Sequence, residues 1–310
     1  MKIQIKENEQ CGMSFEEAYS AFIMDKTSYG VSDSTLKNYH NIFKTFKKYL
    51  DVSSPISELS KRELNGMVVA MRKAKLAQNS IATYTRMMKT FLTWCNNEGY
   101  SDLHWHNVKE IETVKEIYTD AELEKLLVKP SSSSSFCEYR NWVIICFFLN
   151  SGCRASTLRH IQNKDIDLDH RQVVFRHTKT KRIQVNPLCS QMVIILREYI
   201  NIRKGMSENY LFCDQYGDQL SENALRLAVA HYNKSRGVKR TSIHAFRHTF
   251  AHKYLVDGNG DAFSLQKLLG HTTLRTTKHY CQIFNKDLAD KYDEKSPLAQ
   301  LIRQRHRIQR

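Results

Sequence analysis

Residues 244 to 254 read HAFRHTFAHKY, and this stretch combines three histidines with an arginine at helical spacing. His244, His248 and His252 are spaced i, i+4 and i+8, so a helix would stack them along one face. Such a face can hold a metal ion, or it can present protons and positive charge to a phosphate. Arg247, three residues after His244, would share roughly the same face. The spacing alone leaves both interpretations open.

The length and the charge distribution narrow the choice. A chain of 310 residues with 41% hydrophobic residues is long enough for two domains with real cores. Residues 1–117 hold 16 Lys and Arg against 14 Asp and Glu, whereas residues 118–310 hold 31 against 18. A half-chain this basic indicates an acidic polymer as partner, most simply nucleic acid. The alternative is a basic surface that serves only solubility.

Cysteine usage and hydropathy bear on the compartment. The eight cysteines form no C-x-x-C pair, which is typical of a reduced, cytoplasmic protein. The N-terminal MKIQIKENEQ lacks the apolar core of a signal peptide. The longest apolar run, residues 142–149, is too short to span a membrane, so we expect no membrane association. Cys146 lies inside this run and is predicted to be a small buried hydrophobe.

The first third of the chain carries signals for four amphipathic helices. Ser14 and Ser60 are each followed three residues later by Glu, as in capping boxes. The segments 32–34 (SDS) and 79–80 (Asn-Ser) each precede an apolar 3-4 stripe. These signals predict a compact helical bundle over residues 1–112. Its polar faces carry basic residues that are either solvated or candidates for DNA contact: Lys37, Lys44, Lys47, Lys48, Arg86 and Lys89.

A charged segment without an apolar face, residues 106–118, is interpreted as a linker to a second domain, residues 118–310. There, Thr119 and Glu122 form another capping box, and an apolar helix ends at Gly152, a residue suited to a left-handed C-cap. Residues 166–187 change to a strand-like period and predict a small antiparallel β-meander with Lys179 at a hairpin tip. Helical patterns follow over 190–203, 222–234, 242–256, 263–269 and 273–281. The predicted fold class is therefore mainly α with one small meander, and without a Gly-rich phosphate loop nucleotide-triphosphate chemistry has no support.

Four short strings in the second domain form an ordered set: SGCRAS (151–156), HTKTKR (177–182), HAFRHTFAH (244–252) and LLGHTTLRTTKHY (268–280). They supply an arginine, a lysine, a His-x-x-Arg pair, a Gly-His and a tyrosine nine residues later. This order resembles the tyrosine recombinase (phage integrase) family over the whole second domain. The first domain is similar in size and position to the family's SAM-like core-binding domain. Since about 13 residues precede the first capped helix, we expect a two-domain form without an arm-binding domain.

The resemblance implies a site-specific recombinase that cleaves and rejoins DNA through a 3′-phosphotyrosyl intermediate. Tyr280 would be the nucleophile, although its hydroxyl needs a base and a positive field at neutral pH. Arg154 and Arg247 can each fork onto non-bridging oxygens of one phosphodiester. By resemblance, His244 would accept or relay the tyrosine proton, Lys179 would protonate the departing 5′ oxygen, and His271 would hydrogen-bond the phosphate. No metal or other cofactor is needed, because these cations supply the positive charge.

Several alternatives and departures remain at this stage. A metal hydrolase using His244, His248 and His252 is disfavoured because Arg247 would repel a dication. A type IB-like topoisomerase without site pairing shares the chemistry, and a DNA-binding protein without catalysis would explain the charge alone. Lys181 or Arg182 could replace Lys179, which we prefer because it lies eight residues before Pro187, a spacing typical of the family. Thr157 stands where the family commonly has a buttressing acid, and the hairpin tip reads T-K-T where the family commonly has G-K-G.

The resemblance also implies partners. These are double-stranded DNA core sites arranged as inverted repeats, and three further copies of the chain in a homo-tetramer on two such sites. Accessory DNA-bending proteins are compatible with this arrangement, which would serve a mobile element or replicon resolution. Phe284, Leu288 and Tyr292 form one apolar stripe. They predict that a tail of residues 285–310 docks on a neighbouring protomer; docking on its own domain is the alternative.

Overall fold

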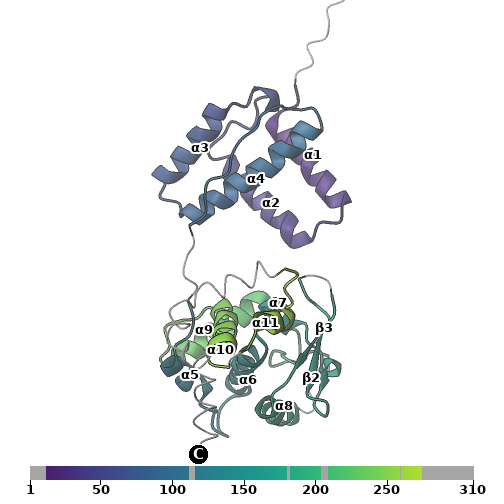
Figure 1. The fold of residues 1–310 in the computed structure, drawn as a ribbon, viewed down its shortest axis with the longest axis vertical. Coiled ribbons are helices and arrows are strands. Elements are labelled where there is room, and N and C mark those ends of the chain that lie inside the picture. The colour runs from purple at the N-terminus through teal and green to yellow at the C-terminus, as the bar shows by residue number, and fades with distance from the viewer. Residues whose placement is uncertain (1–11, 112–115, 180–181, 204–208, 259, 274–310) are drawn as a thin grey trace, which may run out of the picture. The chain divides into compact units, whose positions relative to one another are not determined.

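The computed structural model of the chain describes residues 12–111, 116–179, 182–203, 209–258 and 260–273 (Figure 1). The chain divides into two compact units, Met1–Thr113 and Val114–Arg310. Tyr280, nearly all of the helix predicted over 273–281 and the predicted docking tail lie outside the described residues.

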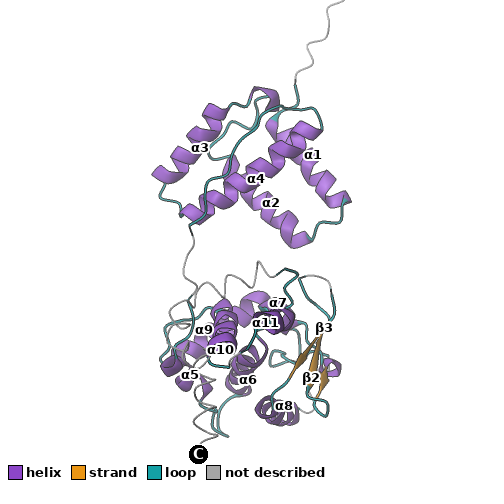
Figure 2. Cartoon of the chain, in the orientation of Figure 1, coloured by secondary structure: helices purple, strands orange, loops and turns teal. Residues whose placement is uncertain are grey.

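Over residues 12–111, the first unit is a bundle of four α-helices (Figure 2). They are α1 (Phe15–Ser28), α2 (Asp33–Phe46), α3 (Lys61–Lys73) and α4 (Gln78–Asn97), with a 3-10 turn at Ile56–Glu58. The two predicted capping boxes are confirmed: Glu17 N donates to Ser14 Oγ at 3.2 Å and Glu63 N donates to Ser60 Oγ at 3.3 Å. Helix α4 packs against each of the other three, so its apolar face forms the centre of the bundle.

Aromatic rings fill the core of the first unit. Phe15, Tyr19, Phe22 and Phe91 are each at most 2% exposed, and the ring of Tyr19 stacks on that of Phe43 at 4.3 Å. Offset and edge-on aromatic pairs of this kind stabilise a core beyond the area they bury. Because the aromatic side chains supply the core, the basic residues on the outer faces of the helices remain exposed to solvent.

The predicted start of α4 is wrong by one or two residues. The N-cap is Ala77, and Asn79 lies inside the helix. The amide of Asn79 is used elsewhere: Nδ2 donates to Ile111 O at 3.1 Å, and Oδ1 accepts from Ile111 N at 2.9 Å. A tertiary bond has therefore replaced the local cap that the sequence suggested.

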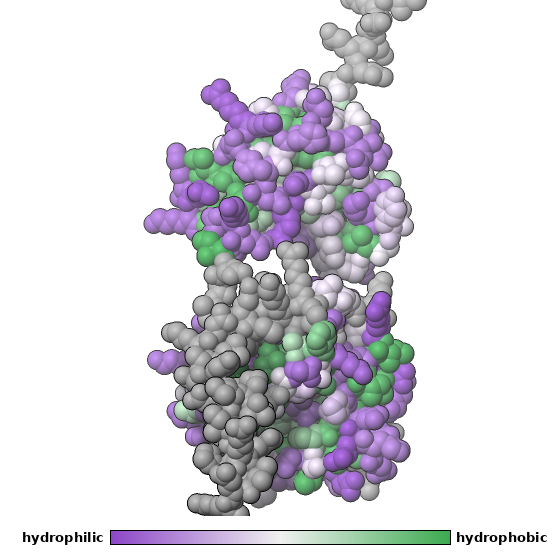
Figure 3. Space-filling view, in the orientation of Figure 1, coloured by the Kyte–Doolittle hydropathy of each residue, from purple (hydrophilic) through white to green (hydrophobic). Residues whose placement is uncertain are grey.

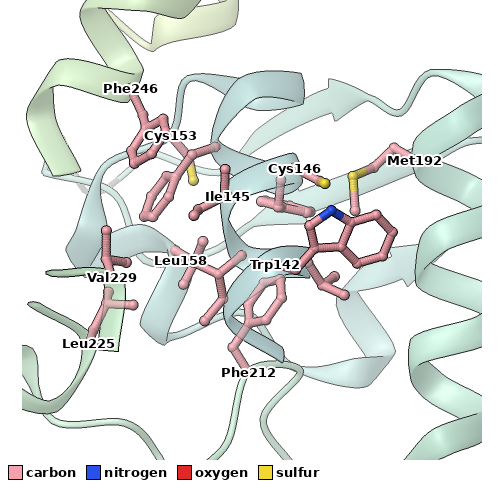
Figure 4. Packing of buried hydrophobic residues seen from close by; sticks show 14 of the residues in the cluster. Trp142, Ile145, Cys146, Cys153, Leu158, Met192, Phe212, Leu225, Val229 and Phe246 are labelled. Carbon is pink, nitrogen blue, oxygen red and sulfur yellow. The ribbon is translucent and has the colours of Figure 1, made fainter. Parts of the chain in front are cut away.

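The second unit surrounds α6 (Phe136–Ser151), whose middle is almost entirely buried. Around it pack α5 (Asp120–Leu127), α8 (Ser190–Ile202), α9 (Glu222–Ser235) and α10 (Ile243–Val256). The short α7 (Ala155–Arg159) packs on α9, and α11 (Ala262–Leu269) packs on α10. Figure 4 shows Trp142 and Cys146 of α6 directed toward Met192 of α8, so the buried role predicted for Cys146 is confirmed.

The predicted meander is also confirmed. Strands β1 (Ile166–Asp167), β2 (Gln172–Phe175) and β3 (Gln184–Pro187) form one antiparallel sheet in the order β1-β2-β3, and a 3-10 turn at Asn163–Asp165 precedes it. Val173 pairs with Asn186 and Phe175 pairs with Gln184. The chain between β2 and β3 contains Lys179, as predicted for a hairpin tip. The fold class predicted from the sequence is thus confirmed.

The segment predicted as a linker is tied down at both ends. Val108 N donates to Thr85 Oγ1 at 3.2 Å in the first unit. Tyr118 N donates to Thr249 Oγ1 at 2.8 Å in the second, and the Tyr118 ring stacks on Phe246 at 4.1 Å. The predicted linker of residues 106–118 was therefore too long, because charged composition does not reveal tertiary bonds.

Figure 3 shows a mainly hydrophilic surface with scattered hydrophobic residues on the described face of each unit. Within the parts of the chain that the structure describes, no helix is both long enough and apolar enough to cross a bilayer.

Candidate active site

Arg247 is the centre of the candidate site. It lies in the first half of α10, and it is only 6% exposed. Its Nη1 donates to Gly152 O at 2.8 Å, and its Nη2 donates to Leu269 O at 3.0 Å and to His271 Nε2 at 2.8 Å. Carbonyls at helix C-termini carry partial negative charge, so they suit a buried cation. One guanidinium thus joins the ends of α6 and α11.

Both of those helix ends depend on glycine. Gly152 caps α6 with φ 58° and Gly270 caps α11 with φ 63°, so the predicted left-handed cap at Gly152 is confirmed. A Cβ at Gly152 would also collide with the side chains of Phe250 and Leu269. The backbone carbonyl that receives Arg247 therefore comes from a position where only glycine fits without strain.

Arg154 follows Gly152 by two residues and is the N-cap of α7, in extended conformation. Its side chain is half-buried. Because Arg247 holds Gly152 O, the same bond orients the short corner that carries Arg154. Thr157 on α7 is 5% exposed. Arg247 is bonded to two backbone carbonyls and an imidazole. These acceptors supply part of the support that a buttressing acid at the position of Thr157 could provide.

His271 follows Gly270 directly. Burial, then Arg247 and then Arg154 lower its pKa to about 4, so the imidazole is neutral at pH 7. A guanidinium can only donate hydrogen bonds, so His271 Nε2 must accept and the proton must lie on Nδ1. The backbone of His271 is fixed as well, since His271 N donates to Gln266 O at 3.0 Å and Gln266 Nε2 donates to His271 O at 3.1 Å.

Lys179 is exposed in the turn between β2 and β3. Thr178 closes the base of this turn: its Oγ1 donates to Arg182 O at 2.7 Å and accepts from Arg182 N at 3.1 Å. Lys181, an alternative to Lys179, lies outside the described residues. The exposed ammonium of Lys179, on a hairpin closed by these two hydrogen bonds, is suited to reach a bound polymer.

His244 is exposed in the first turn of α10, whereas His248 and His252 on the same helix are half-buried. Among the residues that the structure describes, no three His, Cys, Asp or Glu side chains come close enough together to hold a metal ion. The geometry therefore gives no support to the metal-hydrolase alternative.

Three of the six predicted site residues are thus brought together: Arg154, Arg247 and His271. Lys179 and His244 lie on the hairpin and on α10, and Tyr280 is outside the described residues. Sequence reasoning missed two residues of β3, Gln184 and Asn186, which bond to the end of α11. No local signal marks them, because the apolar residues of this stretch, Ile183 and Val185, are exposed while Asn186 is buried.

Comparison with known proteins agrees with the fold. The family model described as "Phage integrase family" matches residues 115–286, and the one described as "Phage integrase SAM-like domain" matches residues 14–110. The chain is 26% identical to the tyrosine recombinase XerC of Thermodesulfovibrio yellowstonii, over 88% of this chain and 94% of the relative. It is 28% identical to the tyrosine recombinase XerA of Saccharolobus solfataricus, over 89% of this chain and 91% of the relative.

Two solved structures share the fold at low identity. The Tn1549 transposon integrase in complex with transposon right end DNA matches with a TM-score of 0.74 and 20% identity, over 92% of this chain and 99% of that one. A lambda integrase tetramer bound to a Holliday junction matches with a TM-score of 0.70 and 17% identity, over 88% and 82%. Since one family model covers more than half of the chain, the chain belongs to the phage integrase family. Its enzyme class is the tyrosine-type site-specific recombinase.

Proposed function

We propose that the chain cleaves and rejoins DNA strands at specific sites through a covalent link between Tyr280 and a 3′ phosphate. The observation that carries this proposal is the buried Arg247, which joins the Gly152 corner, two residues before Arg154, to His271. The guanidiniums of Arg154 and Arg247 and the neutral imidazole of His271 lie close together and form a positively charged cluster. Such pre-organised donors suit the developing negative charge of a phosphodiester in its transition state.

The strand-cleavage step balances without a co-reactant. The Tyr280 oxygen attacks phosphorus and loses its proton to His244, directly or through water. The bond from phosphorus to the 5′ oxygen breaks, and Lys179 protonates that oxygen. The products are a 3′-phosphotyrosyl link and a free 5′ hydroxyl. Attack by a 5′ hydroxyl reverses the step and rejoins a strand, so the bond energy is kept and no nucleotide triphosphate is consumed.

The phosphate oxygens are held by groups with separate tasks. Arg154 and Arg247 offer forked N–H donors to the non-bridging oxygens. His271 offers Nδ1–H, because its Nε2 is already used as the acceptor for Arg247. These fixed positive groups supply what a divalent cation supplies in other phosphoryl-transfer enzymes, so the proposal includes no metal and no other cofactor.

We infer the partners from the relatives and the charge. DNA is the partner in the Tn1549 integrase structures, and a tetramer on a Holliday junction is the assembly of the lambda integrase structure. For this chain we propose inverted-repeat DNA core sites, a homo-tetramer on two such sites and action in the cytoplasm for a mobile element. Residues 1–112 are the core-binding domain and residues 118–310 the catalytic domain, with a tail from about residue 285 exchanged between protomers.

The test uses a pool of nicked DNA duplexes of randomised sequence, because the target site is not known in advance. A nick beside the cleavage point lets the 5′ fragment diffuse away, so cleaved DNA stays attached to the protein. Wild-type protein should capture a related set of sequences covalently, and Tyr280→Phe should bind the same DNA and capture none. Normal capture by Tyr280→Phe would refute the assignment of the nucleophile.

A second assay separates recombination from topoisomerase action. A plasmid with two copies of the captured site should yield recombinant products that a plasmid with one copy does not yield. If the protein relaxes supercoils at the same rate on both plasmids and never recombines them, the type IB-like alternative is correct.

A further inference from the structure

The C-terminal end of α11 rests on two polar side chains of β3. Gln184 Nε2 donates to Leu268 O at 2.7 Å and to Lys267 O at 3.1 Å, and Asn186 Nδ2 donates to Leu268 O at 2.9 Å. Gln184 Nε2 also lies 2.6 Å from Asn186 Oδ1, so two N–H groups are shared among three acceptors. The last carbonyls of a helix lack donors within the helix, and here a strand supplies them.

The contact is close and partly buried. Asn186 is 1% exposed and pairs with Val173 of β2. The Gln184 amide lies against Gly270, the C-cap of α11. The contact is so close that a Cβ added to Gly270 would collide with Gln184 Oε1. The next carbonyl, Leu269 O, accepts from Arg247. The carbonyls of three successive residues at the end of α11 are therefore held from outside the helix by β3 and by α10.

This arrangement connects parts of the site that are distant in sequence. Lys179 lies five residues before Gln184 on the same hairpin, and His271 lies two residues after the last residue of α11. We propose that Gln184 and Asn186 are positioning residues, which hold His271 in register with the Lys179 hairpin by bonding the end of α11. The inference rests on the proposed function, since it assigns these two residues a part in the same reaction.

A positioning role differs from simple support of the fold. If the pair only stabilised α11, its loss would lower the melting temperature and leave the rate of strand cleavage by folded, DNA-bound protein unchanged. If it positions His271, its loss should lower the cleavage rate at saturating DNA, and the loss should depend on His271 being present.

The variants exploit the difference between donors and acceptors. Gln184→Ala removes the donor, Gln184→Glu keeps the length but can only accept, and Gln184→Arg can only donate. The probe is a nicked duplex recovered from the randomised pool, at saturating concentration. We expect Gln184→Ala and Gln184→Glu to cleave roughly ten- to a hundred-fold more slowly with unchanged binding, since small misplacements of reacting groups reduce rates by such factors. Gln184→Arg should cleave at close to the wild-type rate.

The matched control is Gln172→Ala on β2, whose side chain is exposed on the neighbouring strand. It should cleave like wild type. Wild-type rates for Gln184→Ala and Gln184→Glu would overturn the inference, and so would equal losses in Gln184→Glu and Gln184→Arg.

A double-variant cycle then tests the route through His271. In a His271→Ala background, Gln184→Ala should slow cleavage by less than about three-fold, because the group that it positions is gone. If the two losses multiply in full, Gln184 does not act through His271 and the inference fails.

A DNA-free measurement separates this inference from the proposed function. Proton NMR titration of His271, assigned by comparison with His271→Ala, should give a low pKa in the wild type. In Gln184→Ala that pKa should rise toward the ordinary histidine value, while Gln172→Ala leaves it unchanged. An unchanged titration in Gln184→Ala overturns the inference. A wild-type protein that cleaves no DNA from the pool overturns the proposed function, whatever the titration gives.

Discussion

Arg247 donates a hydrogen bond to the carbonyl oxygen of Gly152 at 2.8 Å, across 95 positions of sequence. Gly152 is at once the left-handed cap of α6 and the residue that precedes Cys153 and Arg154. Gly152 therefore both ends the buried helix α6 and begins the segment that carries Arg154 into the candidate phosphate site. Changes that disturb this cap should affect stability and catalysis together.

Gly152→Ala tests this coupling. The left-handed backbone makes an alanine less stable by roughly 1–2 kcal/mol, and the new Cβ collides with Phe250 and Leu269. The free energy of unfolding, measured with urea, should fall by more than this backbone effect, and covalent DNA capture should fall as well. Gly237→Ala is the matched control, because Gly237 has φ 71° but an added Cβ meets nothing within 4 Å. Equal losses in the two variants would show that the collision at Gly152 has no consequence.

Arg247→Lys keeps the charge and removes the fork. One ammonium cannot reach Gly152 O, Leu269 O and His271 Nε2 together, and each lost bond to a charged group destabilises by about 1.5–3 kcal/mol. We expect a lower melting temperature and a cleavage rate reduced by about a hundred-fold or more. Arg197→Lys is the control, since Arg197 is exposed and its Nη2 is 4.0 Å from Asp169 Oδ1. Cleavage at the wild-type rate by the Arg247→Lys variant would mean that charge alone is sufficient.

Several of these features could be predicted from the sequence because their causes are local. A capping box needs a Ser or Thr and a Glu three residues later, and all three that were predicted are formed, at Ser14, Ser60 and Thr119. The left-handed cap at Gly152 and the period change at the meander are equally short-range patterns. Arg154, Arg247 and His271 could be proposed because their motifs occur in order along the chain.

Features that depend on tertiary bonds could not be predicted. Asn79 looks like a helix cap in sequence, but its amide binds the backbone of Ile111. Gln184 and Asn186 look like ordinary strand residues until α11 is placed against β3. The neutral state of His271 is likewise a product of burial and of two arginines from other elements. Each of these partners lies dozens of residues away, beyond the range of a local pattern.

The low pKa of His271 predicts a pH dependence of stability. The imidazole titrates near pH 4 in the folded protein and near 6.5 when unfolded, so between these values the unfolded chain binds more protons. The free energy of unfolding contributed by His271 should therefore fall as the pH drops from 6.5 to about 4, and be constant above 6.5. The free energy of unfolding, measured with urea at several pH values in this window, should therefore change less steeply with pH for His271→Gln than for wild type. His231→Gln, at an exposed position of α9, should leave the slope unchanged; an unchanged slope in His271→Gln would contradict the prediction.

Metal removal should leave catalysis intact. The proposed site obtains its positive charge from Arg154, Arg247 and Lys179, so covalent capture of DNA should continue after dialysis against EDTA. The double variant His248→Ala/His252→Ala should also need no metal for activity. Loss of capture in EDTA, restored by one equivalent of zinc per chain and abolished in the double variant, would favour the three-histidine alternative.

The stripe of Phe284, Leu288 and Tyr292 predicts that assembly can be separated from single-site binding. A short amphipathic segment near a terminus gains stability mainly by docking, and in the proposed tetramer it docks on a neighbouring protomer. Leu288→Asp places a charge in the centre of the apolar stripe, whereas Asn285→Asp adds the same charge outside it. In gel-shift assays with the captured DNA, both variants should bind one site with similar affinity, because both add one negative charge. Only Leu288→Asp should lose the complex of paired sites and the recombinant product. If Leu288→Asp forms paired-site complexes at normal yield, the stripe does not dock between protomers, and docking on its own domain becomes the better account.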